Sequence, residues 1–365
     1  MHLPESQELK IQYLAHLFDN MSECYKLFWF QAIVNKVLEH KREFYYDELI
    51  NEMAADAWYM VSEYKLNLGP ADALESLVHC AYKISGMKSS EKKVKVLAFL
   101  ENCEDKELIG MKNRLTLNVP YRLQAPFIKS LKGNDWKKPV KELAERINKE
   151  KHLIYYFDMI KGLKSKITIQ PEWYDYIIKN AGIIQGWIQY NLVTYLQRRN
   201  PSVPGIVNKI SAPQDRKLDK VKGFWKMMID IEPVHDIYSE QLLQKTNVSI
   251  DHFVPWSYVA HDELWNLSPT TKSINSSKSN HLPEWNIYFP RLCEIEYCAY
   301  QAMWKYDAVH TEFQKIQKEH INNAEIRLKL YRKGLKKEGF SRQLEEIIYP
   351  VYHAAEEMGF QRWEL

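Results

Sequence analysis

Five polar side chains in the segment 249–283 are of the types that hydrolyse phosphodiester bonds. Asp251 and His252 are adjacent, and Asn266, Asn275 and Lys278 follow them along the chain. The carboxylate oxygen of Asp251 and the amide oxygen of Asn275 are hard ligands that suit Mg²⁺ or Mn²⁺. Because they are only two, the cation keeps most of its water and can take phosphate oxygens as further ligands. The sequence therefore predicts a metal site at Asp251 and Asn275.

The remaining three residues complete a hydrolytic site. A histidine titrates near neutral pH and can take a proton from water, so His252 is the predicted general base. The metal would stabilise the charge on phosphorus and on the leaving 3′ oxygen. Asn266 is expected to hold the ring of His252 or its loop through hydrogen bonds. Lys278 lies three residues beyond Asn275, on the same face of a predicted helix, and is expected to touch a phosphate.

The local pattern predicts a β-hairpin packed on a helix around these residues. Apolar and polar residues alternate over 248–254, which is typical of a strand with Asp251 and His252 on opposite faces. Residues 265–267 are expected to return as the second strand. Pro269 is expected to open a helix that Thr270 or Thr271 caps. This arrangement would bring the polar side chains into one neighbourhood.

The motif resembles the HNH, or ββα-metal, endonuclease family. Asn266 lies 14 positions after His252 (266 − 252) and Asn275 lies 9 positions further on (275 − 266), and Lys278 follows. The spacing is similar to that of the HNH nuclease domain of RNA-guided CRISPR effectors. The resemblance implies that Asp251 and Asn275 bind the metal, that His252 is the general base and that Asn266 supports it. It covers about 35 to 50 residues, under a seventh of the chain.

The segment also departs from the family pattern. Many family members carry cysteine pairs that bind a structural zinc beside the hairpin, whereas residues 225–290 contain no cysteine. Packing of Ile237, Tyr238 and Leu242 is expected to replace that zinc. The last motif position is Asn275 rather than the histidine of metal-binding bacterial toxins, which favours Mg²⁺ over softer metals.

Other chemically capable residues lie near the motif. His261 and Asp262 fall in the predicted hairpin loop and are expected to be exposed to solvent or to structure the loop. His281 is an alternative third metal ligand. Cys293 and Cys298 are five positions apart, which matches no metal-ligand spacing, and are expected to be core thiols.

Composition sets the broader limits. The 365 residues carry 50 Lys+Arg and 47 Asp+Glu, a net charge of +3, so any charge argument is local. Hydrophobic content is 45% and only 12 residues are glycine, which indicates an ordinary globular protein rich in helix. Five cysteines do not make a disulfide framework, and no apolar run reaches membrane-spanning length. A cytoplasmic protein without a membrane segment is the simplest expectation.

The predicted fold class is mainly α with a small α+β unit. Residues 1 to about 110 are expected to be all-helical, and a single long helix is expected over 173–199. The sequence predicts four regions: a helical N-terminal domain at 1–199, with a basic subregion at 127–172 that forms a hairpin or a helix; a linker at 200–214; an HNH ββα-metal core at 215–290; and a helical C-terminal region at 291–365.

The function predicted from this resemblance is a metal-dependent endonuclease that hydrolyses DNA, in bacterial defence against foreign DNA. Two basic segments, 129–166 and 315–342, are expected to supply salt-dependent phosphate contacts. Because an unrestrained nuclease would harm its host, control by a protein partner, a homodimer or a feature of the target is expected. Two alternatives stay open: a catalytically silent nucleic-acid-binding adaptor in a complex, and a nuclease that cuts RNA.

Overall fold

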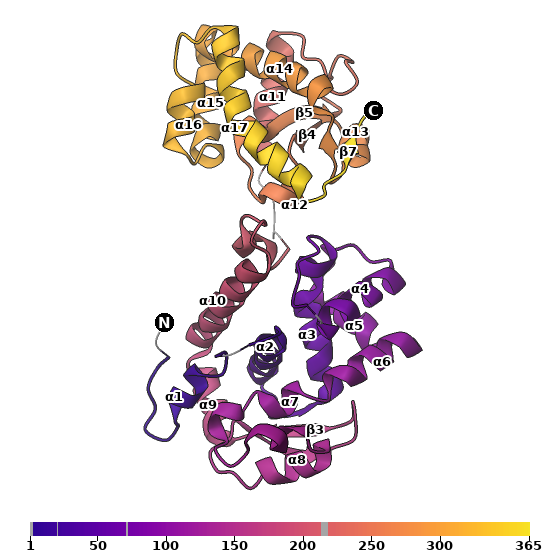
Figure 1. The fold of residues 1–365 in the computed structure, drawn as a ribbon. Helices are drawn as coiled ribbons and strands as arrows, with labels where there is room; N and C mark the ends of the chain where they lie inside the picture. Colours follow the sequence, from indigo (N-terminus) through magenta and orange to yellow (C-terminus); the bar gives the residue numbers. More distant parts are fainter. Residues whose placement is uncertain (1–2, 20, 71, 213–217) are drawn as a thin grey trace. The chain divides into compact units, whose positions relative to one another are not determined.

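The computed structural model describes residues 3–19, 21–70, 72–212 and 218–365, which form two units (Figure 1). The N-terminal unit comprises Met1–Pro201 and Ile206–Ala212, and the C-terminal unit comprises Ser202–Gly205 and Pro213–Leu365. Helices dominate both units, and the strands form three small sheets. The predicted fold class, mainly α with a small α+β unit, is confirmed.

The N-terminal unit is built from helices around one short sheet. Its helices and strands are α1 (Ile11–Ala15), α2 (Tyr25–Leu38), β1 (Glu43–Tyr45), α3 (Tyr46–Ser62), α4 (Ala73–Ser85), α5 (Lys93–Asn102), α6 (Lys106–Leu115), α7 (Val119–Arg122), α8 (Val140–Ile147), β2 (Tyr155–Met159), β3 (Lys166–Ile169), α9 (Pro171–Lys179) and α10 (Ala181–Arg199).

Helix α3 lies at the centre of this unit. It is buried on nearly all sides, since it contacts α2, α4 and α5, and a helix that is apolar all round must be covered all round. Helix α4 is capped at its N-terminus by Asp72, whose carboxylate accepts hydrogen bonds from the backbone of Leu74 and Glu75. It ends at Gly86, which has a φ of +62° and so adopts the left-handed conformation that glycine tolerates best.

Two expectations for this unit are wrong. Residues 1–110 are not all helical, because β1 pairs antiparallel with β3, with Phe44 opposite Ile167. The single helix expected over 173–199 is two helices, α9 and α10. They separate at Asn180, where φ is −113° and the side-chain amide donates to the carbonyl oxygen of Tyr176. Asparagine competes with helix backbone bonds in this way and therefore favours helix ends.

The basic subregion at 127–172 contains the hairpin that was one of its two predicted forms. Strands β2 and β3 pair antiparallel, and the order in the sheet is β1-β3-β2. The aromatic run that follows, 172–178, is helical and belongs to α9.

The C-terminal unit surrounds a two-stranded hairpin with helices (Figure 1). Its helices and strands are α11 (Asp219–Ile231), β4 (Val248–His252), α12 (Trp256–Val259), β5 (Leu267–Thr271), α13 (Lys272–Lys278), β6 (Leu282–Pro283), α14 (Trp285–Lys305), α15 (Asp307–His320), α16 (Ala324–Leu330), α17 (Lys337–Glu357) and β7 (Arg362–Trp363). The predicted boundary at residues 290 and 291 lies inside α14, so the predicted core and C-terminal region share one unit.

The hairpin and its helix position the polar motif. Strands β4 and β5 pair antiparallel, with Asp251 opposite Ser268 and His252 opposite Leu267. Pro269 was expected to open the helix but lies within β5, opposite Ile250. Helix α13 begins three residues later, and the hydroxyl of Thr271 accepts the capping hydrogen bond from Ile274. Of the two expected caps, Thr270 and Thr271, the structure has Thr271.

The chain end also joins this unit. Strand β7 pairs parallel with β6, and the hydroxyl of Tyr352 on α17 donates to the carbonyl oxygen of Pro283. These contacts fix the segment that follows α13. Among the described residues, no helix combines the length and the apolar character that crossing a membrane requires.

Candidate active site

Asp251 is a buried carboxylate on β4 with two donors. Its side chain is only 4% exposed. The hydroxyl of Tyr238 donates to Oδ2 at 2.6 Å. The ammonium of Lys278, on α13, lies 3.2 Å from Oδ1 and 3.0 Å from Oδ2. A buried carboxylate needs such compensation, because an unpaired charge out of water is costly.

Lys278 is itself fully buried. Its ammonium also donates to the backbone carbonyl oxygen of His252 at 2.7 Å. Burial lowers the pKa of Lys278, and the neighbouring charge of Asp251 acts in the opposite direction. A contact from this ammonium to a substrate phosphate, as predicted, would require it to leave Asp251.

Asn275 lies on the face of α13 that packs against β4. Its amide nitrogen donates to Ser249 Oγ at 3.0 Å and to the carbonyl oxygen of Ile250 at 2.8 Å. Both amide hydrogens are therefore used, and the side-chain oxygen is the acceptor that the residue can offer. Asn275 and Asp251 thus come from two facing elements, one strand and one helix.

The donor chemistry fits a hard, hydrated cation. Each carboxylate oxygen has two lone pairs; Oδ2 of Asp251 accepts from both Tyr238 and Lys278, whereas Oδ1 accepts from Lys278. Oδ1 therefore keeps an acceptor position, and Asn275 adds an amide oxygen. A cation held by these two oxygens would complete its coordination with water or substrate oxygens. In the described ranges, no group of three or more His, Cys, Asp and Glu side chains is placed to hold a metal.

His252 ends β4 and contacts a carboxylate from the hairpin loop. Its Nε2 lies 2.8 Å from Oδ1 of Asp262, and its side chain is 6% exposed. The Asp262 side chain is 24% exposed. Of the two roles expected for Asp262, exposure to solvent or structuring of the loop, the structure agrees with the second, because its carboxylate contacts His252 and its carbonyl oxygen contacts His320.

Asn266 holds the loop that follows His252. Its Oδ1 accepts from the backbone N–H of Val254 at 2.7 Å, and its Nδ2 donates to the carbonyl oxygen of Val254 at 2.9 Å. The backbone N–H of Phe253 donates to the carbonyl oxygen of Asn266 at 2.8 Å. Asn266 lies in a short 3-10 turn, Leu264–Asn266, just before β5, and is fully buried. Of the two contacts expected for Asn266, the structure shows the one to the loop.

A polar turn begins at Asp236, in the segment where packing was expected to replace a zinc site. Asp236 is buried, and its Oδ1 accepts from the backbone N–H of Tyr238 at 2.8 Å. Its Oδ2 accepts from the hydroxyl of Thr270 on β5 at 2.6 Å. Ile237 and Tyr238 are buried as expected, but Leu242 is 59% exposed and Leu243 is buried instead. Hydrogen bonds of Asp236 therefore carry much of the role expected for packing.

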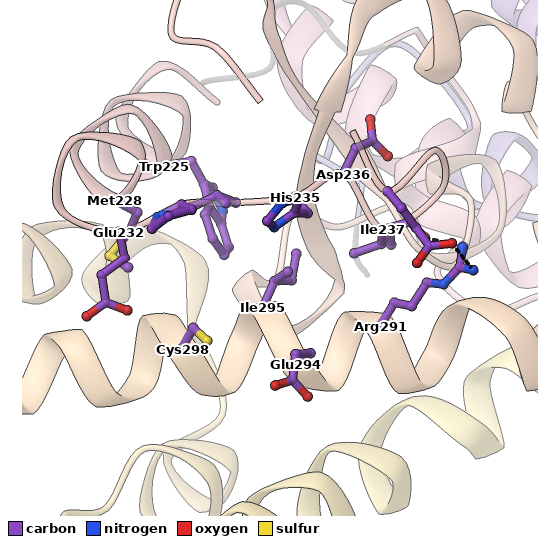
Figure 2. A pocket seen from close by; sticks show the side chains of 13 residues that line it. Trp225, Met228, Glu232, His235, Asp236, Ile237, Arg291, Glu294, Ile295 and Cys298 are labelled. Carbon is purple, nitrogen blue, oxygen red and sulfur yellow. Dashed lines mark hydrogen bonds and ion pairs between the residues drawn. The ribbon is translucent and has the colours of Figure 1, made fainter. Parts of the chain in front are cut away.

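A cavity of about 450 Å³ lies beside this turn, lined by α11, α14 and residues 232–240 (Figure 2). Trp225, Met228 and Ile295 give it apolar walls, and Arg291 pairs with Glu240 at 2.5 Å. Arg291 also donates to the backbone carbonyl oxygens of residues 237 and 238. The cavity wall therefore helps to hold the turn whose Tyr238 bonds Asp251.

The remaining candidates have structural contacts. His281 Nδ1 lies 2.9 Å from the carbonyl oxygen of Lys278, just beyond α13. Cys293 is buried on α14, whereas Cys298 is partly exposed and lines the cavity. Burial raises the pKa of Cys293 to about 11, so its thiol stays protonated near neutral pH.

The sequence did not predict three contacts in this region: the Tyr238 hydroxyl on Asp251, Asp236 on Thr270, and Asp262 on His252. Only the third had a signal, since Asp262 is a charged residue next to a predicted strand end. The other two join residues 13 and 34 positions apart, which no local pattern reveals.

In comparisons with known proteins, residues 235–284 match a family model described as HNH endonuclease. The matched range begins at the Asp236 turn and ends just beyond β6, so it includes the whole hairpin and α13. No curated protein and no solved structure gives a match to this chain.

Proposed function

Since the chain carries an HNH endonuclease domain over residues 235–284, we propose that this nuclease cuts DNA with the help of a divalent metal ion. The observation that supports it most is the convergence of Asp251, His252 and Asn275 on one hairpin–helix unit. Asp251 lies on β4 and Asn275 on α13, which packs against this strand, and the histidine lies at the end of β4.

Asp251 and Asn275 would hold the cation, proposed to be Mg²⁺ or Mn²⁺, through their side-chain oxygens. When bound, such an ion stabilises negative charge on the phosphate and on the leaving oxygen. His252 takes a proton from the attacking water, whose oxygen bonds to phosphorus while the bond from phosphorus to the 3′ oxygen breaks. The leaving oxygen acquires a proton from solvent. One such site cuts one strand at a time.

Asn266 has a positioning role in this proposal. Its two hydrogen bonds to Val254 fix the backbone immediately after His252. Lys278 neutralises Asp251 in the substrate-free protein. Its predicted phosphate contact belongs to the substrate complex, in which the ammonium would exchange Asp251 for the phosphate.

The N-terminal unit is proposed to bind the DNA backbone. Residues 127–166 of this unit carry eleven Lys or Arg against five Asp or Glu. The second basic segment, 315–342, lies on α15 to α17 of the C-terminal unit and is proposed to add further contacts. Phosphate contacts of this kind give affinity without sequence information. We further propose that the protein acts in antiviral defence in the cytoplasm. Its activity is proposed to be controlled by a protein partner, by a homodimer or by a feature of the target. Rapid death of cells that overproduce the protein alone would contradict this control.

The test is plasmid cleavage by the purified full chain in Mg²⁺, Mn²⁺ or EDTA. Wild type is expected to nick supercoiled plasmid only with metal, and His252→Ala should lower the rate by about 10²–10⁴-fold, the usual contribution of a general base. His353→Ala removes an exposed histidine on α17 and should cut like wild type. Equal folding of the variants is checked by circular dichroism.

Other outcomes decide between the alternatives. Undiminished cutting by His252→Ala would contradict the assignment of the base. Metal-dependent cutting of RNA but not of plasmid would make RNA the substrate. Binding of nucleic acid without cutting of either, in every metal, would support the adaptor.

A further inference from the structure

The hairpin loop presents a carboxylate to His252 in a held position. Oδ1 of Asp262 lies 2.8 Å from Nε2 of His252, and both side chains are largely shielded from solvent. A hydrogen bond this short between two shielded side chains orders the ring better than an exposed pair would.

The backbone of Asp262 is itself fixed from another element. Nδ1 of His320, a buried residue that ends α15, lies 2.7 Å from the carbonyl oxygen of Asp262, and only the histidine can donate there. The carboxylate of the next residue, Glu263, accepts from both the backbone and the side chain of Asn322. Two consecutive loop residues are thus tied to the last residue of α15 and to the segment that follows it.

A carboxylate beside one imidazole nitrogen decides which nitrogen carries the proton. Asp262 can only accept when ionised, so Nε2 of His252 must be the donor. The proton then stays on Nε2, and the lone pair that can accept a proton is on Nδ1. We propose that Asp262 is the positioning residue of the general base: it orients the His252 ring and fixes the tautomer in which Nδ1 acts on water. This inference rests on the proposed function.

The tautomer can be measured without any cleavage. In protein with ¹⁵N-labelled histidine at pH 8, a long-range ¹H–¹⁵N spectrum separates protonated from unprotonated ring nitrogens, and His252→Gln identifies the signals. We expect His252 to carry its proton on Nε2 in wild type and to lose this preference in Asp262→Asn. A proton on Nδ1 in wild type, or an unchanged spectrum in Asp262→Asn, would overturn the proposal.

Cleavage then tests whether this tautomer matters. Asp262→Asn is expected to lower kcat by about 10- to 100-fold, the usual effect of losing such a partner, with KM changed less than twofold. Asp262→Glu should recover part of the loss. The matched control is Asp19→Asn, which removes another short His–Asp contact, to His16 in the N-terminal unit, and should leave kcat unchanged.

A purely structural role is excluded by a double variant. His252→Ala has no ring for Asp262 to hold, so adding Asp262→Asn should not slow its residual cleavage further. Equal slowing in both backgrounds would show that Asp262 only maintains the fold. If wild type cuts no nucleic acid but shows the Nε2 proton, the proposal that the chain cuts without a partner fails and the His252–Asp262 relationship stands.

Discussion

The ammonium of Lys278 lies within 3.2 Å of both carboxylate oxygens of Asp251, and neither side chain is exposed by more than 4%. The two charges come from facing elements, α13 and β4, and they cancel each other in the interior of the hairpin–helix unit. Removal of one member of a buried pair leaves the other charge uncompensated, which usually costs about 3–5 kcal/mol. Lys278 therefore stabilises the same carboxylate that the proposed metal site uses.

Lys278→Ala is expected to lower cleavage at least tenfold and to reduce the free energy of unfolding, because Asp251 loses its cation. The slope of log Kd for DNA against log salt then separates two roles. A phosphate contact predicts that the slope falls by about one, whereas a role confined to Asp251 leaves it unchanged. Lys272→Ala, an exposed lysine at the start of α13, is the matched control for stability. Full activity of Lys278→Ala would contradict both roles.

Asn266→Ala should destabilise the C-terminal unit. The substitution leaves the buried N–H and carbonyl oxygen of Val254 without their partners, and each such group costs about 1–3 kcal/mol. A loss of about 2 kcal/mol or more is expected in urea unfolding followed by tryptophan fluorescence. Asn266→Asp should be worse still, because a carboxylate oxygen would face the carbonyl oxygen of Val254.

The matched control for this prediction is Asn286→Ala, an exposed position on α14. Such surface changes stay within about 0.5 kcal/mol. Equal unfolding midpoints for Asn266→Ala and Asn286→Ala would refute the structural role given to Asn266.

Tyr238→Phe tests the second donor to Asp251. Burial, and secondarily the charge of Asp251, raise the pKa of Tyr238 well above its usual value, so the hydroxyl keeps its proton and donates throughout pH 6.5–9. We expect the Mg²⁺ concentration for half-maximal cleavage to change about tenfold, by the same factor at every pH in this range. If the ratio of the Mg²⁺ concentrations required by Tyr238→Phe and by wild type approaches one as the pH rises, the hydroxyl of Tyr238 ionises in this pH range.

Tyr300→Phe is the control for this effect. The hydroxyl of Tyr300 also makes backbone hydrogen bonds in the C-terminal unit, to residues 332 and 335, but does not contact Asp251. Tyr300→Phe should lower the unfolding temperature with no change in the Mg²⁺ requirement. If both variants shift the requirement equally, the effect comes from stability rather than from the bond to Asp251.

The first strand and the helix cap were predictable because their signals are local: alternation over 248–254 marked β4, and Thr271 was one of the two predicted caps of α13. The second strand, expected at 265–267, begins only at Leu267, because Leu264–Asn266 form a 3-10 turn. The prediction that Pro269 opens the helix was wrong; it arose because proline usually stops a strand. Pro269 is accommodated because β5 is an edge strand of a two-stranded sheet, where a missing N–H is tolerated.

Contacts between distant residues were not predictable in the same way. Strand β1 was missed because three residues carry no period, and it forms only by pairing with β3, which lies more than 120 positions later. In the turn beside the hairpin, the backbone bridge between His235 and Leu242 determines which of Leu242 and Leu243 is buried. Such a bridge sets which leucine points inward, and the sequence does not encode it locally.

The last prediction concerns the lysines around β2. Four exposed lysines lie in the loops on either side of this strand, and within the part of the chain that the structure describes none of them takes part in an ion pair. Replacing all four with alanine should weaken DNA binding and lower the salt slope by up to about three or four, because each phosphate contact releases close to one counterion. The four residues are Lys149, Lys151, Lys161 and Lys164.

The control must change the charge by the same amount elsewhere in the N-terminal unit. Alanine at four other exposed lysines, on α4, α5 and the loop between them, lowers the net charge equally. Those residues are Lys83, Lys88, Lys92 and Lys95. If both quadruple variants lose the same affinity and the same slope, general attraction by net charge explains the binding. If only the variant without the four lysines around β2 loses affinity and slope, these lysines form the DNA-binding surface, because screening by salt weakens distant charges far more than direct contacts.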